Sequence, residues 1–400
     1  RDIIYNQELK NNDLMKLKKK IAVVTGTRAE YGILKPLLNE IIKSPCLDLK
    51  LLVSGMHLLP QYGLTINEIK NDGFDITRTV KIYDKKVKNN IYYSESLARG
   101  ITNFSYAFHE LKPDITVVFG DRIEALAAAL ASATMRIPLA HIHGGDKTDD
   151  GHIDESIRNS ISQFAHIHFT ATKSHSQRLI RFGEQPWRII QVGALGLDSI
   201  VDRKPISKKI LFKKLGLEDQ KTLVCLFHPV NAEEHKKGKI MNTILESIRE
   251  LKIQSVVIYP NNDSGNLPII KEIKKFSNLP FIRVFPSLAH SEYLSLLHHS
   301  DVLVGNSSSG MIETPSIGIP VVNIGLRNRG REHGQNILFV DINKKNIIKA
   351  INKALFNSDF IKKSKRGKNP YGDGNSSGRI TSTLCELILN ERLLRKIPTR

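Results

Sequence analysis

Carboxylates and histidines that could transfer protons gather in one stretch of the first half of the chain. They follow the ends of two short apolar runs or open the amphipathic segment after them: Asp121, His143, Asp146, Asp154 and Glu155. Because the carboxyl ends of parallel strands meet at one edge of a sheet, we expect these side chains to face one cleft. Such a set is suited to general acid–base catalysis. The structural alternative is that they only cap helices or favour a helix dipole.

A second interpretation of this stretch is a metal site. His141 and His143 are two residues apart in an expected strand and would therefore face one side, with Asp146 and His152 nearby. Two imidazoles on one face can bind a metal together. No cysteine supports them, however, and Arg122 is close, so we expect no metal there.

Two turns that could hold phosphate lie far apart in the chain. In each, an apolar run ends in glycine and small hydroxyl residues, and a helical pattern follows: Thr25-Gly26-Thr27-Arg28 and Gly305-Asn306-Ser307-Ser308-Ser309-Gly310. A helix N-terminus offers unpaired N–H groups and a partial positive charge to a diphosphate. The alternative for the serines is simple helix capping. Neither turn contains the Gly-x-Gly-x-x-Gly fingerprint, which argues against a nicotinamide cofactor.

Three further side chains of the second half complete a possible nucleotide site. His228 follows an expected strand, and a histidine there is often structural unless a ligand lies near it. Glu313 lies one turn beyond the second phosphate turn, where its carboxylate could accept from ribose hydroxyls. Arg331 would supply a counter-charge for the diphosphate.

The elements that must position these residues alternate between strand and helix, which is typical of parallel α/β sheets. Helical spacing is clear from Leu34 to Ile42 and in Ile123–Thr134. The expected strands are Ile21–Thr25, Leu49–Val53, Ile115–Phe119, Leu139–Ile142 and Ile167–Thr170, then Thr222–Phe227, Ser255–Tyr259, Phe281–Phe285, Val302–Val304 and Val321–Ile324.

The chain of 400 residues is too long for one core, so we expect two domains. An N-terminal Rossmann-like domain would span 15–198 and supply the catalytic side chains. A C-terminal one would span 199–376 and bind the nucleotide. Residues 377–400 would form a helix, Ile380–Leu394, and a tail that crosses back to the first domain. Residues 1–14 precede Met15, and we expect a non-native or disordered leader there.

Composition limits the classes of function. The net charge is +19, but the lysines are spread over helices and tails rather than gathered on one face. Attraction of an anionic small substrate therefore explains this charge more simply than nucleic-acid binding does. The longest apolar run, Ala125 to Thr134, is too short to span a bilayer. The three cysteines are scattered, odd in number and not spaced for metal, which indicates a reducing cytoplasm.

Taken in order, these motifs resemble the hydrolysing UDP-N-acetylglucosamine 2-epimerases of sialic-acid biosynthesis. The resemblance runs from about residue 20 to 380, and its ordered set of motifs is specific even though several would be unremarkable alone. The matching segments are Thr25-Gly26-Thr27-Arg28-Ala29-Glu30-Tyr31-Gly32, Ser54-Gly55-Met56-His57, Gly120-Asp121-Arg122, His141-Ile142-His143-Gly144-Gly145, Asp154-Glu155-Ser156-Ile157-Arg158, His228-Pro229, Gly305-Asn306-Ser307-Ser308-Ser309-Gly310, Gly330-Arg331-Glu332 and Asn369-Pro370-Tyr371-Gly372-Asp373-Gly374.

The resemblance implies a GT-B-like fold of two Rossmann-like domains facing a cleft, without metal or redox cofactor. It implies anti elimination of UDP across C1–C2 to give 2-acetamidoglucal, then addition of water to release N-acetylmannosamine. Asp121 and Asp154 match the family's catalytic carboxylates, and His228 matches its cleft histidine. Some relatives carry Glu where this chain has His143, so either His143 or Asp146 could take the remaining acid–base role. The residues assigned to UDP are Arg28, Arg122, Gly305, Ser307, Ser308, Glu313 and Arg331.

Several alternatives stay open. A sister enzyme would hydrolyse UDP-2,4-diacetamido-2,4,6-trideoxyglucose on the route to legionaminic acid, although the segments 141–145 and 182–186 look more like the N-acetylglucosamine branch. A non-hydrolysing 2-epimerase fits less well, because 120–122 and 154–158 are hydrolysing-type variants. A GT-B glycosyltransferase would not need this many carboxylates, and an RNA-binding protein is suggested only by charge. We expect a UDP-sugar as partner, a homodimer or homotetramer, and no nucleic acid or membrane.

Overall fold

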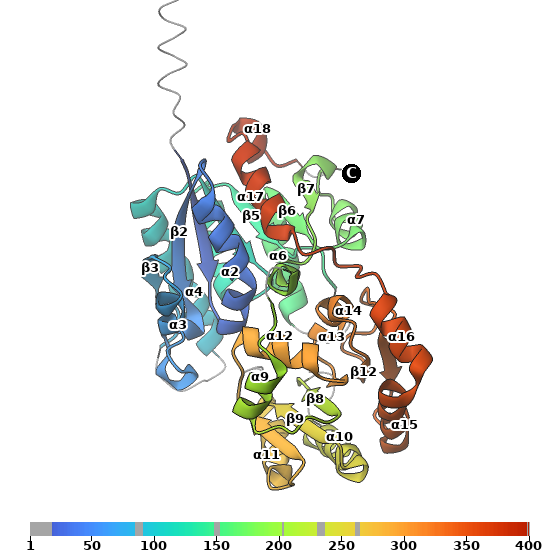
Figure 1. Ribbon diagram of the computed structural model, residues 1–400. Coiled ribbons are helices and arrows are strands. Elements are labelled where there is room, and N and C mark those ends of the chain that lie inside the picture. The colour runs from blue at the N-terminus through green and yellow to red at the C-terminus, as the bar shows by residue number, and fades with distance from the viewer. Residues whose placement is uncertain are drawn as a thin grey trace, which may run out of the picture. The chain divides into compact units, whose positions relative to one another are not determined.

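The computed structural model describes residues 18–84, 91–147, 153–201, 204–229, 237–260, 265–397 and 399. The chain divides into two compact units (Figure 1). Unit 1 contains the described parts of Arg1–Gly145, Ser156–Leu195 and Asn375–Arg400, and unit 2 those of Asp146–Glu155 and Gly196–Gly374. The leader expected at 1–14 lies outside the described residues.

Unit 1 is built on a parallel sheet of seven strands in the order β3-β2-β1-β4-β5-β6-β7. Alternate residues of β1 enter different cores: Ile21 and Val23 pack on one face, and Ala22 and Val24 on the other. Both faces are therefore covered, as buried parallel strands require. The strands are β1 (Lys19–Thr25), β2 (Leu47–Ser54), β3 (Ile76–Val80), β4 (Ile115–Phe119), β5 (Leu139–Ile142), β6 (Ile167–Thr170) and β7 (Ile189–Gln191).

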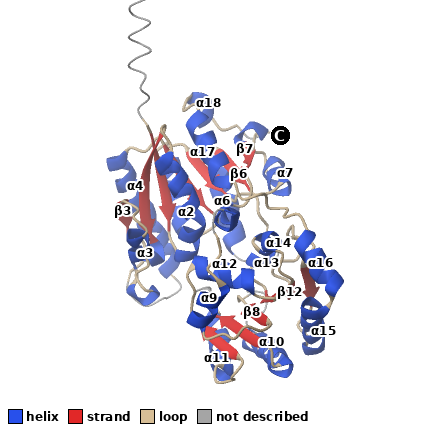
Figure 2. Ribbon diagram, viewed as in Figure 1, coloured by secondary structure: helices blue, strands red, loops and turns tan. Residues whose placement is uncertain are grey.

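Helices surround the sheet of unit 1 (Figure 2). The alanine-rich α5 begins and ends where its sequence pattern predicts, and it packs against α4. The α-helices are α2 (Arg28–Lys43), α3 (Ile66–Asn71), α4 (Tyr92–Leu111), α5 (Ile123–Thr134), α6 (Ile153–Phe164), whose first three residues group with unit 2, and α7 (Lys173–Arg181). Short 3₁₀ turns are η1 (Gly55–Leu58), η2 (Pro60–Tyr62) and η3 (Pro186–Arg188).

Unit 2 repeats this scheme with a parallel sheet of six strands in the order β10-β9-β8-β11-β12-β13. Its strands are β8 (Thr222–Leu226), β9 (Gln254–Ile258), β10 (Ile282–Phe285), β11 (Val302–Gly305), β12 (Val321–Ile324) and β13 (Ile337–Val340). Its helices are η4 (Leu195–Leu197), α8 (Asp198–Val201), α9 (Lys208–Leu215), α10 (Lys237–Leu251), α11 (Asn266–Phe276), α12 (His290–His299), α13 (Ser309–Ile312), α14 (Thr314–Ile317), α15 (Lys344–Phe356) and α16 (Ser358–Arg366), with η4 beginning at the boundary.

The expectation of two parallel α/β domains is confirmed. The strands that the sequence did not predict are β3, β7 and β13. All three lie at sheet edges and are only partly buried. β3 carries polar residues and β7 has only three residues, so their sequence patterns are weak. β13 is a short apolar run that the sequence analysis missed.

The C-terminal segment returns to unit 1, but the expected single helix over Ile380–Leu394 is wrong. Helix α17 (Ser376–Glu386) packs on α2, and a separate short helix, α18 (Glu391–Leu394), follows. Leu387 has a non-helical ψ of 123° and ends α17, while the Asn390 side chain caps α18. Lys19 donates from Nζ to three carbonyls at the end of α17, those of Leu384, Cys385 and Leu387, at 3.0, 2.6 and 2.6 Å.

A disulfide joins Cys46 to Cys385, with a Cα–Cα distance of 5.8 Å across a sequence separation of 339 residues. The interpretation of the cysteines as scattered thiols of a reducing cytoplasm is therefore wrong for this pair. Two cysteines far apart in sequence met because α17 folds back onto unit 1. Only Cys225 is a free thiol among the cysteines, and it is buried.

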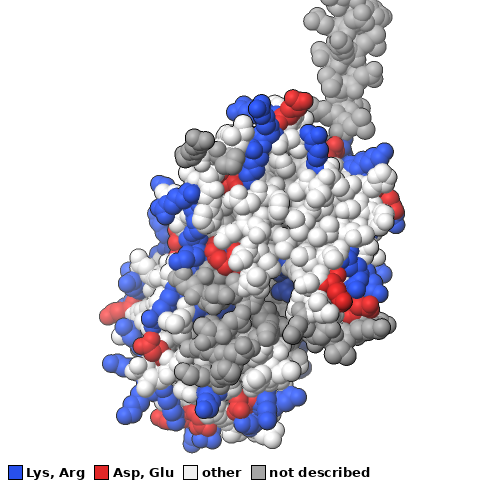
Figure 3. All heavy atoms as spheres, turned by 180° about the vertical axis from the view of Figure 1, so that it is seen from behind, with Lys and Arg blue, Asp and Glu red and all other residues white. Residues whose placement is uncertain are grey.

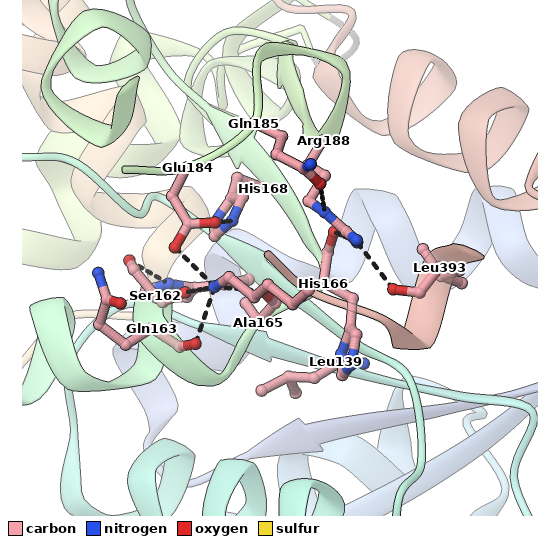
Figure 4. Close-up of polar contacts among 12 residues, drawn as sticks. Leu139, Ser162, Gln163, Ala165, His166, His168, Glu184, Gln185, Arg188 and Leu393 are labelled. Carbon is pink, nitrogen blue, oxygen red and sulfur yellow. Dashed lines mark hydrogen bonds and ion pairs between the residues drawn. The ribbon is translucent and has the colours of Figure 1, made fainter. Parts of the chain in front are cut away.

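Arg188 anchors the last helix to unit 1 (Figure 4). Its side chain is fully buried, and its guanidinium donates to the carbonyls of Arg392, Leu393 and Arg395 at 3.1, 2.8 and 3.0 Å. A guanidinium offers five donors in a fixed plane, so it can satisfy several carbonyls at a helix end.

Lys396 anchors the tail a second time, at the end of α6. Its Nζ donates to the buried Glu184 carboxylate at 2.6 Å and to the carbonyls of Ser162, Gln163 and Ala165. Burial alone would raise the pKa of Glu184, but hydrogen bonds from His168 and Lys396 hold it below its usual range. Among the described residues, no helix is both long and apolar enough to cross a membrane.

Candidate active site

Asp121 lies just beyond the end of β4, as its sequence position predicts. Gly120, which precedes it, has a φ of +70°, a left-handed conformation that glycine adopts without strain. The Asp121 carboxylate forms an ion pair with the guanidinium of Arg158, a buried residue of α6. The ion pair fixes the direction of the carboxylate. Sequence reasoning included Arg158 in a motif but gave it no role.

The two histidines of the β5 exit differ in their surroundings. His141 is fully buried, with its Nε2 at 2.7 Å from the Gly120 carbonyl and its Nδ1 at 3.0 Å from Ser162 Oγ. His143 lies beyond the strand with a φ of +65°, so the two rings do not share a strand face as expected. The His143 Nε2 accepts from the Leu195 N–H at 3.4 Å, and its ring packs on Phe119.

The metal interpretation required His141 and His143 to act together. Both nitrogens of His141 are hydrogen-bonded to protein groups, so its ring is not a ready ligand. In the part of the chain that the structure describes, no three His, Cys, Asp or Glu side chains lie together as a metal site. His152 lies outside the described residues.

Asp146 groups with unit 2, where it forms an ion pair with Arg331. The pair is bidentate, since Arg331 Nε also lies 3.4 Å from the Asp146 Oδ1, and both side chains are largely buried. The sequence analysis treats Asp146 as an acid–base candidate and Arg331 as a counter-charge for UDP. In the structure each neutralises the other. Asp154 lies in the first turn of α6 and is half-buried.

The first phosphate-type turn is a capped helix start. The Thr27 side chain accepts from the Glu30 N–H at 3.3 Å, which satisfies one free donor at the start of α2. Arg28 Nε lies 2.7 Å from the Glu68 carboxylate, and Arg122 Nε lies 3.7 Å from that of Glu124. Arg28 and Arg122, two of the three arginines assigned to UDP, thus each lie beside a carboxylate.

Two buried carboxyls below this turn were missed by sequence reasoning. Glu124 packs so closely against Gly26 that a Cβ there would meet its Cγ at 2.7 Å. Burial, followed by the nearby Glu124 charge, raises the pKa of Glu30 well above its usual value. Tyr83 donates to Glu124 Oε1 at 3.2 Å. Both glutamates lie in helical segments with ordinary patterns, so no local signal distinguishes them.

The second phosphate-type turn is held by asparagine side chains. Gly305, at the end of β11, has a φ of +139°, and a Cβ there would lie 2.0 Å from the Leu226 carbonyl oxygen, so only glycine fits. Asn306 accepts from the His228 N–H at 2.7 Å and donates to the His228 carbonyl at 2.9 Å. These two bonds join the exits of β8 and β11 and place His228 beside the turn.

Asn328 completes this support. It is fully buried, and its Nδ2 donates to the carbonyls of Asn306 and Ser307 at 2.9 and 3.2 Å. Its Oδ1 accepts from Arg331 at 3.4 Å. Sequence reasoning missed Asn328, because only the fold brings it against the turn.

The helix expected after the second turn is broken into α13 and α14. Pro315 near the start of α14 lacks an N–H and favours a new helix start there. Ser307 Oγ accepts from the Ser309 N–H at 3.3 Å, and Ser308 makes no side-chain cap. Glu313 lies at the break between the helices. Burial raises its pKa to about 7, against the opposing effects of its own N–H, Ser309 and Arg331.

The geometry thus supplies two kinds of chemistry. Unit 1 offers an oriented carboxylate, Asp121. Unit 2 offers a glycine–serine turn and, at the end of the short helix that follows it, a buried carboxyl, Glu313. The first can move a proton, and the second can bind an oxygen-rich anion and accept from hydroxyls.

Comparison with known proteins identifies the family. The UDP-N-acetylglucosamine 2-epimerase family matches residues 39–385. The chain is 36% identical over 379 residues to the UDP-N,N'-diacetylbacillosamine 2-epimerase (hydrolyzing) of Legionella pneumophila, covering 94% of this chain and 98% of the relative. It is also 36% identical over 337 residues to a UDP-N-acetylglucosamine 2-epimerase of Neisseria meningitidis, covering 84% of this chain and 87% of the relative.

The fold agrees with solved structures. The crystal structure of UDP-GlcNAc 2-epimerase from Neisseria meningitidis bound to UDP-GlcNAc matches with a TM-score of 0.78 at 21% identity, covering 92% of this chain and 100% of that one. The fold is therefore GT-B-like, as expected. The protein is an enzyme that acts on a nucleotide sugar. It belongs to the UDP-N-acetylglucosamine 2-epimerase family.

Proposed function

We propose that this enzyme is a hydrolysing 2-epimerase of a UDP-linked 2-acetamido sugar. UDP is eliminated across C1–C2 to give a glycal, and water then adds to release a free sugar with the opposite configuration at C2. The main support is the family match over residues 39–385, whose curated relatives include hydrolysing enzymes.

The catalytic roles follow from the chemistry of each side chain. The C2 proton is weakly acidic, so a positioned carboxylate must remove it while the diphosphate leaves. We assign Asp121 and Asp154 to the sugar. His143 and Asp146 are the candidates for a further acid–base role, and the Asp146–Arg331 ion pair favours His143, because Asp146 is already neutralised.

The nucleotide roles are proposed for the turn of unit 2 and its neighbours. Serine hydroxyls and cations would hold the diphosphate, His228 would lie beside it, and the Glu313 carboxylate would accept from ribose hydroxyls. No metal or redox cofactor enters this scheme, because the positive charge for the leaving diphosphate comes from arginines. The residues assigned to UDP are Arg28, Arg122, Gly305, Ser307, Ser308, Glu313 and Arg331.

Two sugars are candidates for the substrate. We place UDP-N,N'-diacetylbacillosamine first, because the Legionella relative that carries this name is matched over 98% of its length. This sugar is the 2,4-diacetamido-2,4,6-trideoxyglucose of the legionaminic-acid route. UDP-N-acetylglucosamine, whose product would be N-acetylmannosamine for sialic-acid biosynthesis, is the second candidate. It is supported by the Neisseria relative at the same identity of 36%.

A comparison of the two sugars tests the proposal. Purified enzyme is given each UDP-sugar separately, with and without EDTA, and UDP release is followed to steady state. We expect UDP release from one sugar to exceed that from the other by at least about tenfold in kcat/KM, since a pocket that fits one set of ring substituents binds the other less well. We expect EDTA to have no effect. Release from neither sugar would refute the proposal.

The assembly is also a proposal. Helix α4 exposes Tyr93 and Tyr106, and Ile91 lies at its start, although the chain as a whole is rich in charge. Seen from the side opposite to Figure 1, a broad area of uncharged side chains covers part of unit 1 (Figure 3). A homodimer or homotetramer would bury such a face, and light scattering of the purified protein tests this. A cytoplasmic location stays a prediction, which cell fractionation tests.

A further inference from the structure

His141 on β5 is a fully buried histidine that the proposed acid–base scheme does not use. Its Nε2 lies 2.7 Å from the carbonyl oxygen of Gly120, the residue directly before Asp121. Its Nδ1 lies 3.0 Å from Oγ of Ser162 on α6. His141 therefore connects the end of β4, where Asp121 begins, to the middle of α6.

The partners of His141 determine where its proton lies. A carbonyl oxygen can only accept, so Nε2 carries the proton and donates to Gly120. The other nitrogen, Nδ1, then accepts from the Ser162 hydroxyl. Burial lowers the pKa of His141 to about 3, so the ring is neutral at any pH at which the enzyme would work. A neutral ring with both nitrogens engaged orients its partners and does not exchange protons with a substrate.

Helix α6 reaches Asp121 by two routes. Arg158 and Ser162 are four residues apart and so lie on one face of the helix. Arg158 pairs with the Asp121 carboxylate, and Ser162 holds His141, which holds the Gly120 carbonyl. One helix thus fixes the side chain of Asp121 through one residue and its backbone through another.

The space around this connection is filled. A Cβ on Gly144 would lie 2.9 Å from Ser162 Oγ and 3.0 Å from His141 Nδ1. The ring therefore has little room to turn or to exchange its partners. Loss of its Nε2 donor would leave the half-buried Gly120 carbonyl without this partner, and we expect the segment to move.

We propose that His141 is a positioning residue for the reaction, which sets the backbone at Gly120 so that the Asp121 carboxylate meets the sugar at the correct distance. This inference rests on the proposed function, since Asp121 is its proposed catalytic carboxylate. The role belongs to the neutral Nε2–H form of the ring. His141 itself touches no substrate.

The test compares three variants in steady-state turnover of the preferred UDP-sugar. In His141→Leu the donor is lost, and we expect kcat to fall by about tenfold to a hundredfold with KM little changed, because a shift of about 1 Å costs about that much. In His141→Gln an amide N–H can replace the donor, and most of kcat should return. The control is His166→Leu. His166 is also buried with a lowered pKa, of about 4, and it accepts from the Leu139 N–H at the other end of β5.

The control separates positioning from stability. We expect His141→Leu and His166→Leu to lower the melting temperature alike, but only the first to lower kcat. Equal losses of kcat in both, or normal kcat in folded His141→Leu, would overturn the inference. If His141→Leu does not fold, Ser162→Ala takes its place, since it removes only the donor to Nδ1. It should lower kcat less than His141→Leu would, and unchanged kcat there would count against the inference.

A spectroscopic measurement keeps this inference separate from the proposed function. Failure of the wild-type enzyme to turn over either UDP-sugar would refute the proposed function alone. Nitrogen-15 NMR of the histidine rings should still show the Nε2–H form of His141 without titration between about pH 5 and pH 9. An Nδ1–H form, or a ring that titrates in this range, would overturn the positioning role whatever the activity.

Discussion

Nucleotide binding by this enzyme should depend on pH through Glu313. Its carboxyl is buried at the break between α13 and α14, and burial raises its pKa from 4.5 to about 7. Within the described structure, its Oε2 has no hydrogen-bond partner. An ionised oxygen without a partner is a strong acceptor for a ribose hydroxyl, whereas a protonated carboxyl is a weaker one.

The sign and the size of the effect follow from this pKa. The ligand favours the ionised form, so affinity is highest above the pKa and falls as the pH drops through it. With a pKa of about 7, the ionised fraction falls from about nine tenths at pH 8 to about one tenth at pH 6. Affinity should therefore fall about tenfold between these values, or about 1.4 kcal/mol.

Calorimetry on the Asp121→Asn variant measures this affinity with turnover greatly reduced. The ligand should be UDP-N-acetylglucosamine rather than UDP, because the terminal phosphate of UDP itself titrates near pH 6 and the sugar diester does not. The matched control is Glu313→Gln, which should bind more weakly at pH 8 and show no pH dependence. If the affinity of the Asp121→Asn variant does not change with pH, or if Glu313→Gln shows the same slope, Glu313 does not control nucleotide binding.

Further predictions concern catalysis, the diphosphate and the C-terminal tail. Asp121→Asn and Asp154→Asn should each lower kcat by about a hundredfold or more, the scale of lost acid–base catalysis, with UDP affinity unchanged in calorimetry. Near-normal turnover in both would make these carboxylates structural. Arg331→Ala should weaken UDP binding by about 1.5–3 kcal/mol, and an unchanged affinity would place the nucleotide elsewhere. Lys396→Met should destabilise the fold by about 3 kcal/mol, because it removes the cation beside the buried Glu184 carboxylate. An unchanged midpoint in thermal unfolding would contradict that role.

The sequence predicted the parts of the fold and the site that local pattern controls. Central strands such as β4 and β5 are short, mostly apolar and fully or nearly fully buried, and each ends at glycine or polar residues, so their limits could be predicted directly. Glycines at strand ends marked the turns because few other residues adopt a positive φ, and hydroxyl residues marked them because their side chains can cap a helix. Asp121 was placed at the end of β4 by the same logic.

Contacts between distant segments could not be predicted in this way. The Cys46–Cys385 disulfide depends on the return of α17, and the Asp146–Arg331 ion pair joins residues 185 apart in the chain. Asn328 supports the second turn through hydrogen bonds that its position in the sequence does not predict. Such pairings arise from tertiary packing. The spacing of residues along a single sequence does not reveal them.

The proposed reaction removes and replaces the proton at C2 while UDP is released. The most direct measurement is NMR of the purified protein with UDP-N,N'-diacetylbacillosamine, and separately with UDP-N-acetylglucosamine, in deuterated water. We expect a free sugar of inverted C2 configuration carrying deuterium at C2, formed together with UDP. A released sugar that keeps its original configuration and its C2 proton would contradict it.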